Sequence, residues 1–237
     1  MHRSSVLFAL AGASLAAAQG FSTECTDISL NNSWLVATCP SGNGDDITSS
    51  VFLNSNVGND GGDLAWKEDG QYRQSCRECT LIDGNTLQCS CPIATGPSYQ
   101  TTSLNLEEHI ANYEGHLLSN RTGEITTVPE NSDTPVPLDF GVQLGLDTLN
   151  DDCSGVGMTL SLNLPTDCYY VNPGVQDILF TSGVQSGNNG WEIAAYSDKE
   201  CTSEIVHTFT ADENDQCVAF EPKAMAWSVK PLWNADY

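Results

Sequence analysis

Basic residues are scarce in this sequence. Its 237 residues include 8 Lys and Arg against 31 Asp and Glu, which gives a formal net charge of −23 at pH 7. A chain with this charge repels phosphate backbones and anionic lipid headgroups. We therefore expect no nucleic-acid partner and no membrane partner, and we interpret the acidity mainly as a source of solubility.

Long apolar runs are also lacking, except at the start of the chain. After the first eighteen residues, no segment approaches the roughly 20 apolar residues that a membrane-spanning helix requires. The start itself has Arg3, an apolar run from Val6 to Leu15, and then Ala16-Ala17-Ala18. This order is typical of a secretory signal peptide. We predict that residues 1–18 are cleaved before Gln19 and that the mature protein is secreted and extracellular.

Cysteine, in contrast, is abundant. Ten cysteines remain after the predicted cleavage, and export through an oxidising compartment makes disulfides the expected state of all of them. The sequons that begin at Asn31 and Asn120 fit the same route and predict N-glycosylation.

The first half of the sequence contains an internal repeat with a period of about fifty residues. The copies cover about residues 21–66 and 72–117, and Cys25 and Cys39 of the first copy align with Cys76 and Cys91 of the second. Other aligned pairs are Phe21 with Tyr72, Leu35 with Leu87, Leu53 with Leu106, Val57 with Ile110, Asn59 with Asn112, and Gly62 with Gly115.

Each copy has the same predicted order of elements. A short strand opened by Cys leads through a turn to a returning strand closed by Cys, and a further strand ends in a turn-rich segment. The strongest turn dipeptides are Asn43-Gly44 and Asp83-Gly84. The sequence therefore predicts an all-β domain with internal pseudo-symmetry. Because a copy of about fifty residues is too small to bury a core alone, the copies should pack together or exchange strands.

The cysteine spacing predicts nested disulfides in this domain. The pairs Cys25–Cys39 and Cys76–Cys91 bracket hairpins, and Cys79–Cys89 would bridge the second hairpin nearer its turn. The four cysteines of the second hairpin have the number and pairing that a tetrahedral zinc site requires. Nested disulfides explain the same spacing and suit an oxidising compartment, so we expect no metal and no cofactor.

Three motifs of this half, FSTECTDISLNNSWLVATC, SSVFLNSNVGNDGGDLAW and LNLEEHIANYEGHL, resemble the cyanovirin-N homology family. The resemblance runs from about residue 21 to 118 and implies a pseudo-symmetric two-repeat lectin domain at residues 19–118. The secretory signal and the additional Cys79 and Cys89 suggest a fungal member.

The resemblance also implies two mannose-binding sites at opposite ends of the domain. The first would combine Thr23, Glu24, the loop from Pro40 to Gly42, Asn112, Tyr113 and Glu114. The second would combine Asn59, Gly61, Gln74, Ser75 and the loop from Pro92 to Ala94. Pro92, Ile93, Ala94 and Gly61 replace polar or acidic residues of the family, and Pro40 replaces a polar residue in the first site. These departures predict a second site that is weak or lost.

One segment within this domain gathers groups that bind metals or transfer protons. They are Glu107, Glu108, His109, Glu114 and His116. The first copy has Asn54, Ser55, Asn56 and Gly61 at four of these positions, so this chemistry is not part of the repeated unit. The resemblance implies a short helical turn here with Ile110 pointing inward, and acidic residues at its start suit the helix dipole. We interpret the cluster as structural and the turn that begins at Asn112 as the candidate site.

The second half reads as a linker and a second small domain. Residues 119–137 are polar and contain three prolines, which is typical of an interdomain linker. Residues 138–237 contain short strand-like runs separated by turn residues and predict a β-rich domain of unknown function. Its four cysteines allow three connectivities, of which the most local is Cys153–Cys168 with Cys201–Cys217. No family resemblance is evident here.

Two further features of the second half have structural explanations. Asp151-Asp152 and the acidic run 212–215 lack the spacing of a dedicated calcium loop. Trp191, Tyr196, Trp227 and Trp233 could stack on sugars, but aromatic residues of small β domains usually belong to the core.

These observations favour a secreted lectin that binds mannose-rich or related glycans through hydrogen bonds and that is not an enzyme. Two alternatives remain: a non-binding structural or interaction protein of the fungal surface, and a glycan-active enzyme with paired carboxylates in the second domain. The sequence also allows two chains to exchange strands and form a domain-swapped dimer.

Overall fold

The computed structural model describes residues 20–120, 134–137, 140, 142–147, 156–170, 179–183, 190–213, 216–218, 222 and 224–237. The predicted signal peptide 1–18, residues 121–133 of the predicted linker, Asp151-Asp152 and Cys153 lie outside the described residues. We call residues 20–120 the first unit and the described residues from 134 onward the second unit.

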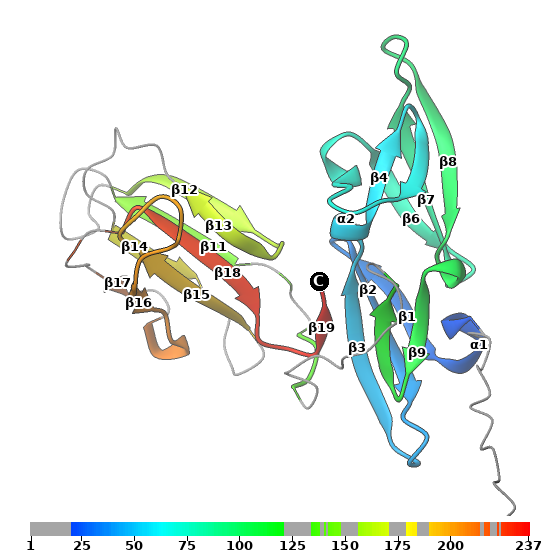
Figure 1. The fold of residues 1–237 in the computed structure, drawn as a ribbon, viewed down its shortest axis with the longest axis horizontal. Helices are drawn as coiled ribbons and strands as arrows, with labels where there is room; N and C mark the ends of the chain where they lie inside the picture. Colours follow the sequence, from blue (N-terminus) through cyan, green and yellow to red (C-terminus); the bar gives the residue numbers. More distant parts are fainter. Residues whose placement is uncertain are drawn as a thin grey trace, which may run out of the picture.

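The first unit is built from two copies of one supersecondary motif (Figure 1). The first copy consists of α1 (Phe21–Glu24), β1 (Thr26–Asn31), β2 (Trp34–Pro40), β3 (Asp46–Phe52), α2 (Leu53–Asn56), β4 (Val57–Asp60) and β5 (Asp63–Trp66). The second consists of η1 (Tyr72–Gln74), β6 (Arg77–Ile82), β7 (Thr86–Pro92), β8 (Tyr99–Asn105), η2 (Leu106–Glu108), β9 (Ile110–Tyr113) and β10 (His116–Ser119). Sheet β1-β2-β3 corresponds to sheet β6-β7-β8, and hairpin β4-β5 corresponds to hairpin β9-β10. The predicted all-β repeat is confirmed.

The hairpin turns of the two copies use left-handed backbone. Asp83 and Gly84 have φ values of 52° and 76° and join β6 to β7. The matching turn of the first copy is Asn32-Ser33, with φ values of 47° and 73°. Two successive residues with positive φ match the twist of antiparallel strands, and Asn, Asp and Gly, which tolerate this conformation best, occupy three of the four positions. The fourth is Ser33, whose hydroxyl is bonded to Tyr72.

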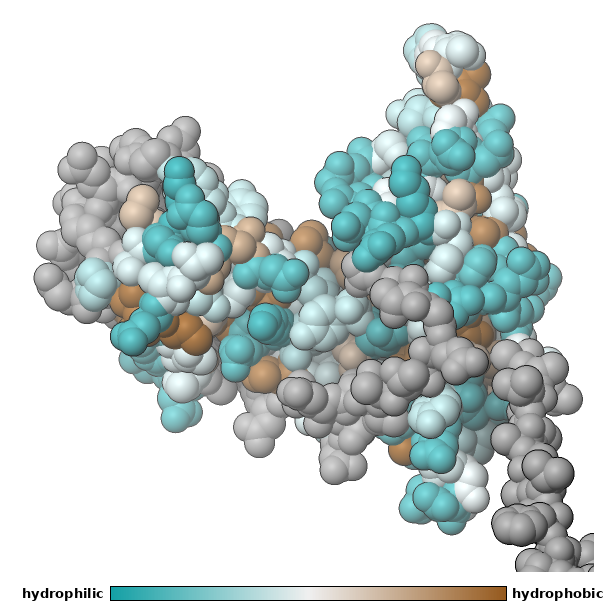
Figure 2. Space-filling model, viewed as in Figure 1, coloured by the Kyte–Doolittle hydropathy of each residue, from teal (hydrophilic) through white to brown (hydrophobic). Residues whose placement is uncertain are grey.

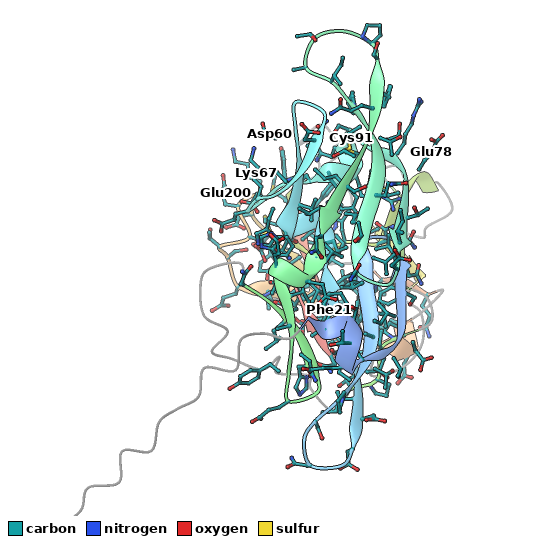
Figure 3. All side chains as sticks on the ribbon, turned by 90° about the vertical axis from the view of Figure 1, so that its right-hand side faces the viewer. Phe21, Asp60, Lys67, Glu78, Cys91 and Glu200 are labelled. Carbon is teal, nitrogen blue, oxygen red and sulfur yellow. A yellow bond between two sulfur atoms is a disulfide. The ribbon has the colours of Figure 1, made fainter. Side chains whose placement is uncertain are left out.

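Each copy places its second hairpin on the sheet of the other copy. The backbone N–H of Leu117 in β10 donates to Ser49 Oγ in β3 at 2.6 Å. In the same way, the N–H of Leu64 in β5 donates to Thr102 Oγ1 in β8 at 3.1 Å. This exchange closes one core from two small halves, as the repeat predicted. Phe21 of α1 lies inside that core (Figure 3).

The second unit contains two four-stranded sheets, in the orders β12-β11-β14-β17 and β13-β18-β15-β16. Their strands are β11 (Val142–Asp147), β12 (Val156–Leu162), β13 (Thr166–Tyr170), β14 (Leu179–Gly183), β15 (Trp191–Tyr196), β16 (Ile205–Thr208), β17 (Cys217–Val218) and β18 (Ala226–Pro231), with the short helix η3 (Ala211–Glu213). All described pairings within these sheets are antiparallel. Trp191, Trp227 and Trp233 are at most 3% exposed and form the core, as expected.

The two units share a hydrophobic core at their junction. Trp34 of β2 is fully buried, and its ring centroid lies 4.6 Å from that of Phe52, 5.6 Å from that of Phe140 and 5.1 Å from that of Trp233. The indole N–H of Trp34 donates to the carbonyl of Asn163 at 3.2 Å. A sheet residue of the first unit is therefore a core residue of the second, and the units are docked.

The end of the chain returns to the first unit. Strand β19 (Ala235–Asp236) pairs in parallel with β3 and becomes the fourth strand of the first sheet. Asn234, which is fully buried, fixes this strand: its side-chain N–H donates to Thr48 O at 3.2 Å, and its side-chain oxygen lies 3.1 Å from His116 Nδ1. The sequence assigns residues 138–237 to the second domain, but Ala235 and Asp236 pack in the first sheet.

The disulfides agree with the prediction in the first unit and differ from it in the second. Cys25–Cys39, Cys76–Cys91 and Cys79–Cys89 are present. Cys168 is bonded to Cys201. The predicted pairs Cys153–Cys168 and Cys201–Cys217 are therefore both wrong. Local pairing fails because β18, from the end of the chain, inserts between β13 and β15, so neighbours in the sheet are not neighbours in sequence.

Candidate functional site

The first candidate site is organised by the side chain of Asn112. Its amide N–H groups donate to Glu24 Oε2 at 3.0 Å and to the carbonyl of Pro40 at 3.1 Å. Its oxygen accepts from the N–H of Gly115 at 2.8 Å. One amide thus ties the turn between β9 and β10 to the end of α1 and to the end of β2. The structure brings together three segments that the sequence predicted to meet.

The side chains around this amide face solvent. Thr23, Glu24, Gly42 and Glu114 are exposed, and Tyr113 is 40% exposed. Glu114 has a left-handed backbone conformation, with φ 50°, in the turn that joins β9 to β10. Two carboxylates, a phenol and the Thr23 hydroxyl border the turn, while Thr23 Oγ1 itself donates to Gly20 O at 3.0 Å. The surface offers several hydrogen-bond groups on a fixed backbone.

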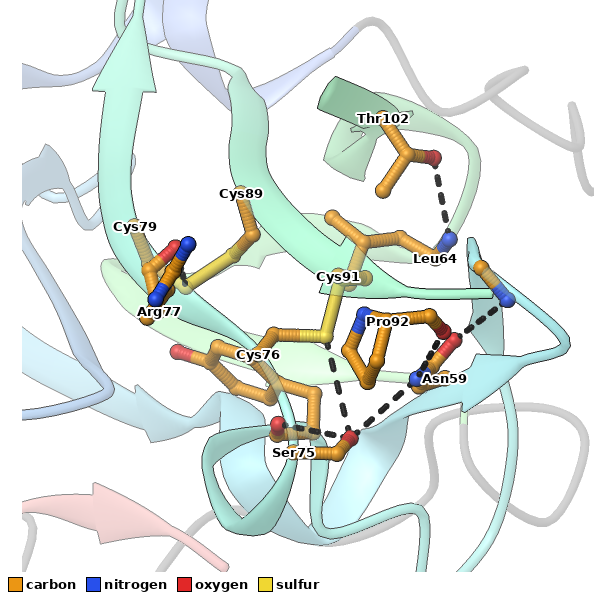
Figure 4. Close-up of a disulfide and its surroundings, with 12 residues drawn as sticks. Asn59, Leu64, Ser75, Cys76, Arg77, Cys79, Cys89, Cys91, Pro92 and Thr102 are labelled. Atoms are coloured by element: carbon orange, nitrogen blue, oxygen red, sulfur yellow. Dashed lines mark hydrogen bonds between the residues drawn. A yellow bond between two sulfur atoms is a disulfide. The ribbon is translucent and has the colours of Figure 1, made fainter. Parts of the chain in front are cut away.

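The second candidate site repeats this geometry around Asn59 (Figure 4). The Asn59 amide donates to Ser75 Oγ at 3.3 Å and to the carbonyl of Pro92 at 3.2 Å, and its oxygen accepts from Gly62 N–H at 2.7 Å. Ser75 thus stands where the first site has Glu24, and Pro92 stands where it has Pro40. Gln74 lies beside Ser75 and donates to the side chain of Gln71.

The second turn is less polar and more closed than the first. Gly61 occupies the position of Glu114, and its carbonyl accepts from the N–H of Ala94 at 3.3 Å. A Cβ on Gly62 would lie 2.9 Å from Ile93 Cγ2, so the loop after Pro92 packs directly against this turn. The predicted replacement of polar groups by Pro92, Ile93 and Ala94 therefore lies at the turn itself.

The acidic and histidine side chains of residues 107–116 do not form one site, because they contact different parts of the molecule. Glu107 accepts from the N–H of Ser22 at 3.2 Å and from Asn85 at 3.3 Å, which ties α1 to the second copy. The ring of His109 stacks on Trp66 with 4.5 Å between centroids. His116 is 5% exposed and contacts Asn234. Among the described residues, no three His, Cys, Asp or Glu side chains converge as metal ligands would.

The sequence prediction missed the role of two prolines. The sequence comparison considers only the side chains of Pro40 and Pro92, but each contributes its backbone carbonyl as an acceptor for the turn asparagine. The signal was present, because both copies place Pro directly after their second aligned cysteine, at Cys39-Pro40 and Cys91-Pro92. The sequence prediction also missed Tyr99, which is 43% exposed near the second turn and has the Arg77 guanidinium 3.9 Å above its ring.

The two predicted sequons differ in their surroundings. Ser33 of the first sequon is buried, and its hydroxyl accepts from Tyr72 OH at 3.0 Å. Asn120 of the second is exposed and directly follows β10. N-glycosylation at Asn31 and Asn120 stays a prediction. In the described part of the chain, no helix has both the length and the apolar character of a membrane span.

Residues 21–118 match the family model of the CVNH domain. The second unit has no family assignment. Among solved structures, GzCVNH of Gibberella zeae is 28% identical, covers 42% of this chain and 95% of its own, and has a TM-score of 0.38. An MoCVNH3 variant bound to (N-GlcNAc)4 is 23% identical, with coverages of 43% and 98% and a TM-score of 0.39. Microvirin bound to mannobiose is 26% identical, with coverages of 41% and 95% and a TM-score of 0.37.

Proposed function

We propose that this protein, whose residues 21–118 form a CVNH domain, is an exported lectin that binds mannose-rich or related glycans mainly at the turn around Asn112. The observation that carries the proposal is the three-way junction at Asn112, whose amide joins the turn to Glu24 and to Pro40 at 3.0 and 3.1 Å. The four disulfides of the described residues suit a protein of the secretory pathway.

The chemistry of the first turn suits a sugar. Vicinal hydroxyls need fixed acceptors and donors, and the carboxylates of Glu24 and Glu114 offer acceptors on segments that Asn112 holds in place. Tyr113, at 40% exposed, offers an apolar face with a polar tip. In this proposal, recognition uses hydrogen bonds and the aromatic face of Tyr113, so we expect binding without a cofactor.

The second turn contributes less to binding in this proposal. It has Ser75 and Gly61 where the first turn has Glu24 and Glu114, and the Gly61 carbonyl is engaged by Ala94 N–H. We therefore expect the turn around Asn59 to bind glycans more weakly than the turn around Asn112. If both sites engage one branched glycan, the second contact gains from the high effective concentration.

The test is a titration of the full chain with mannobiose and with (N-GlcNAc)4, monitored through amide chemical shifts. The key variant is Glu114→Gly, which gives the first turn the residue of the second. Because Glu114 has φ 50°, glycine fits its backbone without strain. The matched control is Glu78→Gly, since Glu78 is also exposed, has φ 55° and belongs to β6, which is not part of the first turn.

We expect saturable shifts at Asn112 and Tyr113 in the unmodified chain and in Glu78→Gly. In Glu114→Gly the affinity should fall about tenfold, equivalent to about 1.4 kcal/mol, because one charged hydrogen-bond partner is lost. Absence of shifts at both turns with either sugar in a folded chain would favour the non-binding surface protein. Equal affinity of the two variants would remove Glu114 from the site.

A further inference from the structure

A cleft with both polar and apolar lining residues lies where the second unit meets the first. It has a volume of about 390 Å³ and is lined by Asn54, Asp69, Gln71 and Arg73 of the first unit and by Leu164 and Pro165 of the second. Figure 2 shows the molecule hollowed between its two lobes, with hydrophilic surface on the side of the first unit. The volume falls within the range of pockets that hold small ligands.

The wall of the first unit is fixed by backbone hydrogen bonds. The N–H of Gln71 donates to Asn54 O at 2.8 Å, and the N–H of Arg73 donates to Asn54 Oδ1 at 3.1 Å. Asp69 and Gln71 have φ values of 51° and 50°, a left-handed conformation that costs energy in residues other than glycine. Gly70 between them packs so closely on Val57 that a Cβ would lie 2.2 Å from its carbonyl carbon. These contacts hold the backbone of this wall in one conformation.

The lining has the composition of a sugar site. The side-chain N–H groups of Asn54 and Gln71 and the guanidinium of Arg73 supply donors, and Asp69 adds a carboxylate to the same wall. The amide oxygens of Asn54 and Gln71 already accept from Arg73 N–H and from Gln74, which fixes the direction of both amides. Arg73 makes no ion pair with any residue that the structure describes, so its donors face the cleft or solvent. The opposite wall is apolar, because Leu164, 38% exposed, and Pro165 can cover the C–H face of a pyranose ring.

We propose that this cleft binds one pyranose residue of a neutral glycan, and that the second unit serves recognition by supplying its apolar wall. The site has no counterpart in the pseudo-symmetry, because the second copy has no domain docked at the corresponding position among the described residues. It is distinct from the turn around Asn112. Gln74 also lines the cleft, so a glycan at the weaker turn near Ser75 can extend into it.

The test uses the full chain and three neutral probes: mannobiose, (N-GlcNAc)4 and cellotetraose. Amide shifts at Gln71, Arg73 and Leu164 report the cleft, and shifts at Asn112 report the first turn. The variant Leu164→Glu replaces the apolar wall with a carboxylate opposite Arg73. The control Ile205→Glu makes the same change at a residue of the second unit that is 52% exposed and does not line the cleft.

With at least one probe, we expect saturable shifts at the cleft residues. Leu164→Glu should weaken this binding about tenfold and leave the shifts at Asn112 unchanged, while Ile205→Glu should change neither. The inference is overturned if no probe shifts the cleft residues at millimolar concentration, or if Leu164→Glu leaves their titration unchanged. Either result is separable from the proposed function, which depends on the shifts at Asn112.

Discussion

At the residue scale, Asn112 and Asn59 perform one structural task in two different settings. Each uses its amide oxygen to hold its own turn and its amide N–H groups to hold two other segments. The difference lies in the partner: Asn112 faces the carboxylate of Glu24, and Asn59 faces the hydroxyl of Ser75. This difference makes the two positions a matched pair for mutagenesis.

The variants Asn112→Asp and Asn59→Asp should therefore differ in stability. The new carboxylate keeps the acceptor for the turn N–H but loses both donors, and at Asn112 it also stands 3.0 Å from the former partner atom of Glu24. We expect a loss of about 1 to 3 kcal/mol at position 112 and a smaller loss at position 59, where the Ser75 hydroxyl can donate to the new group. Urea unfolding at neutral pH measures both, and a larger loss at position 59 would contradict the assignment.

The buried phenol of Tyr72 should make the free energy of unfolding fall at alkaline pH. Burial raises the pKa of its phenol above the ordinary value of 10.0, against the opposing effects of the Ser33 hydrogen bond and the Arg73 charge. Because the unfolded chain loses this proton at lower pH than the folded chain, the contribution of neutral Tyr72 is complete below about pH 10 and is lost as pH rises toward the folded pKa.

The variant Tyr72→Phe tests this contribution. At pH 7 it should cost about 1 kcal/mol, since the Tyr72–Ser33 hydrogen bond of 3.0 Å disappears. Above pH 10 the stability of the variant should fall less steeply than that of the unmodified chain. Parallel curves of unfolding free energy against pH for the two proteins would show that Tyr72 titrates normally.

At the scale of elements, the hairpins of the first unit followed from sequence because their signals are local. Cysteines bracket each hairpin, turn residues occupy the positions with positive φ, and the repeat supplies an independent check. The pairing Cys168–Cys201 could not be derived in this way, since it depends on β18 entering the sheet between β13 and β15 from the end of the chain. The interdomain cleft depends on the same long-range packing.

The first copy has an apolar pair of residues in place of the disulfide Cys79–Cys89. Ile28 and Ala37 occupy the equivalent positions, with similar burial of each pair: Ala37 is fully buried and Cys89 is 1% exposed, while Ile28 and Cys79 are both half-buried. We expect the double variant Cys79→Ile, Cys89→Ala to keep the fold, because the substituted residues already suit this motif.

The cost of this replacement should be below that of removing the outer bridge. The two bridges are nested, so each restricts a loop that the other has already partly closed, and chain entropy alone does not separate them. The outer bridge should still cost more, because Cys76 and Cys91 are both buried and alanine leaves their sites underfilled, whereas Ile and Ala already suit the inner positions. We expect a loss of less than about 2 kcal/mol for the inner pair and about 3 kcal/mol for Cys76→Ala, Cys91→Ala. Urea unfolding of both variants decides the order, and circular dichroism checks that each is folded.

At the scale of the whole molecule, the asymmetry between the copies contains a signal for domain docking. Trp34 and Phe52 are paired across β2 and β3, and the equivalent pair in the second copy is Thr86 and Asn105. The copy that carries apolar residues on this face is the one that the second unit covers. Aligned positions with similar residues reveal the repeat. Aligned positions with different residues, such as Trp34 and Thr86, indicate which copy the second unit packs against.

Replacing Trp34 by Thr, the residue at the equivalent position 86 of the second copy, should uncouple the unfolding of the two units. Because Trp34 and Trp233 belong to one core, we expect the full chain to unfold in a single transition. Trp34→Thr should cost about 3 to 5 kcal/mol, as for other large core deletions, and split the calorimetric transition in two. The control Trp66→Thr removes a tryptophan that stacks on His109 within the first unit, so it should lower stability while keeping one transition. Two transitions in the unmodified chain would show that the junction does not couple the units, and the second unit would then have no fixed wall to offer the cleft.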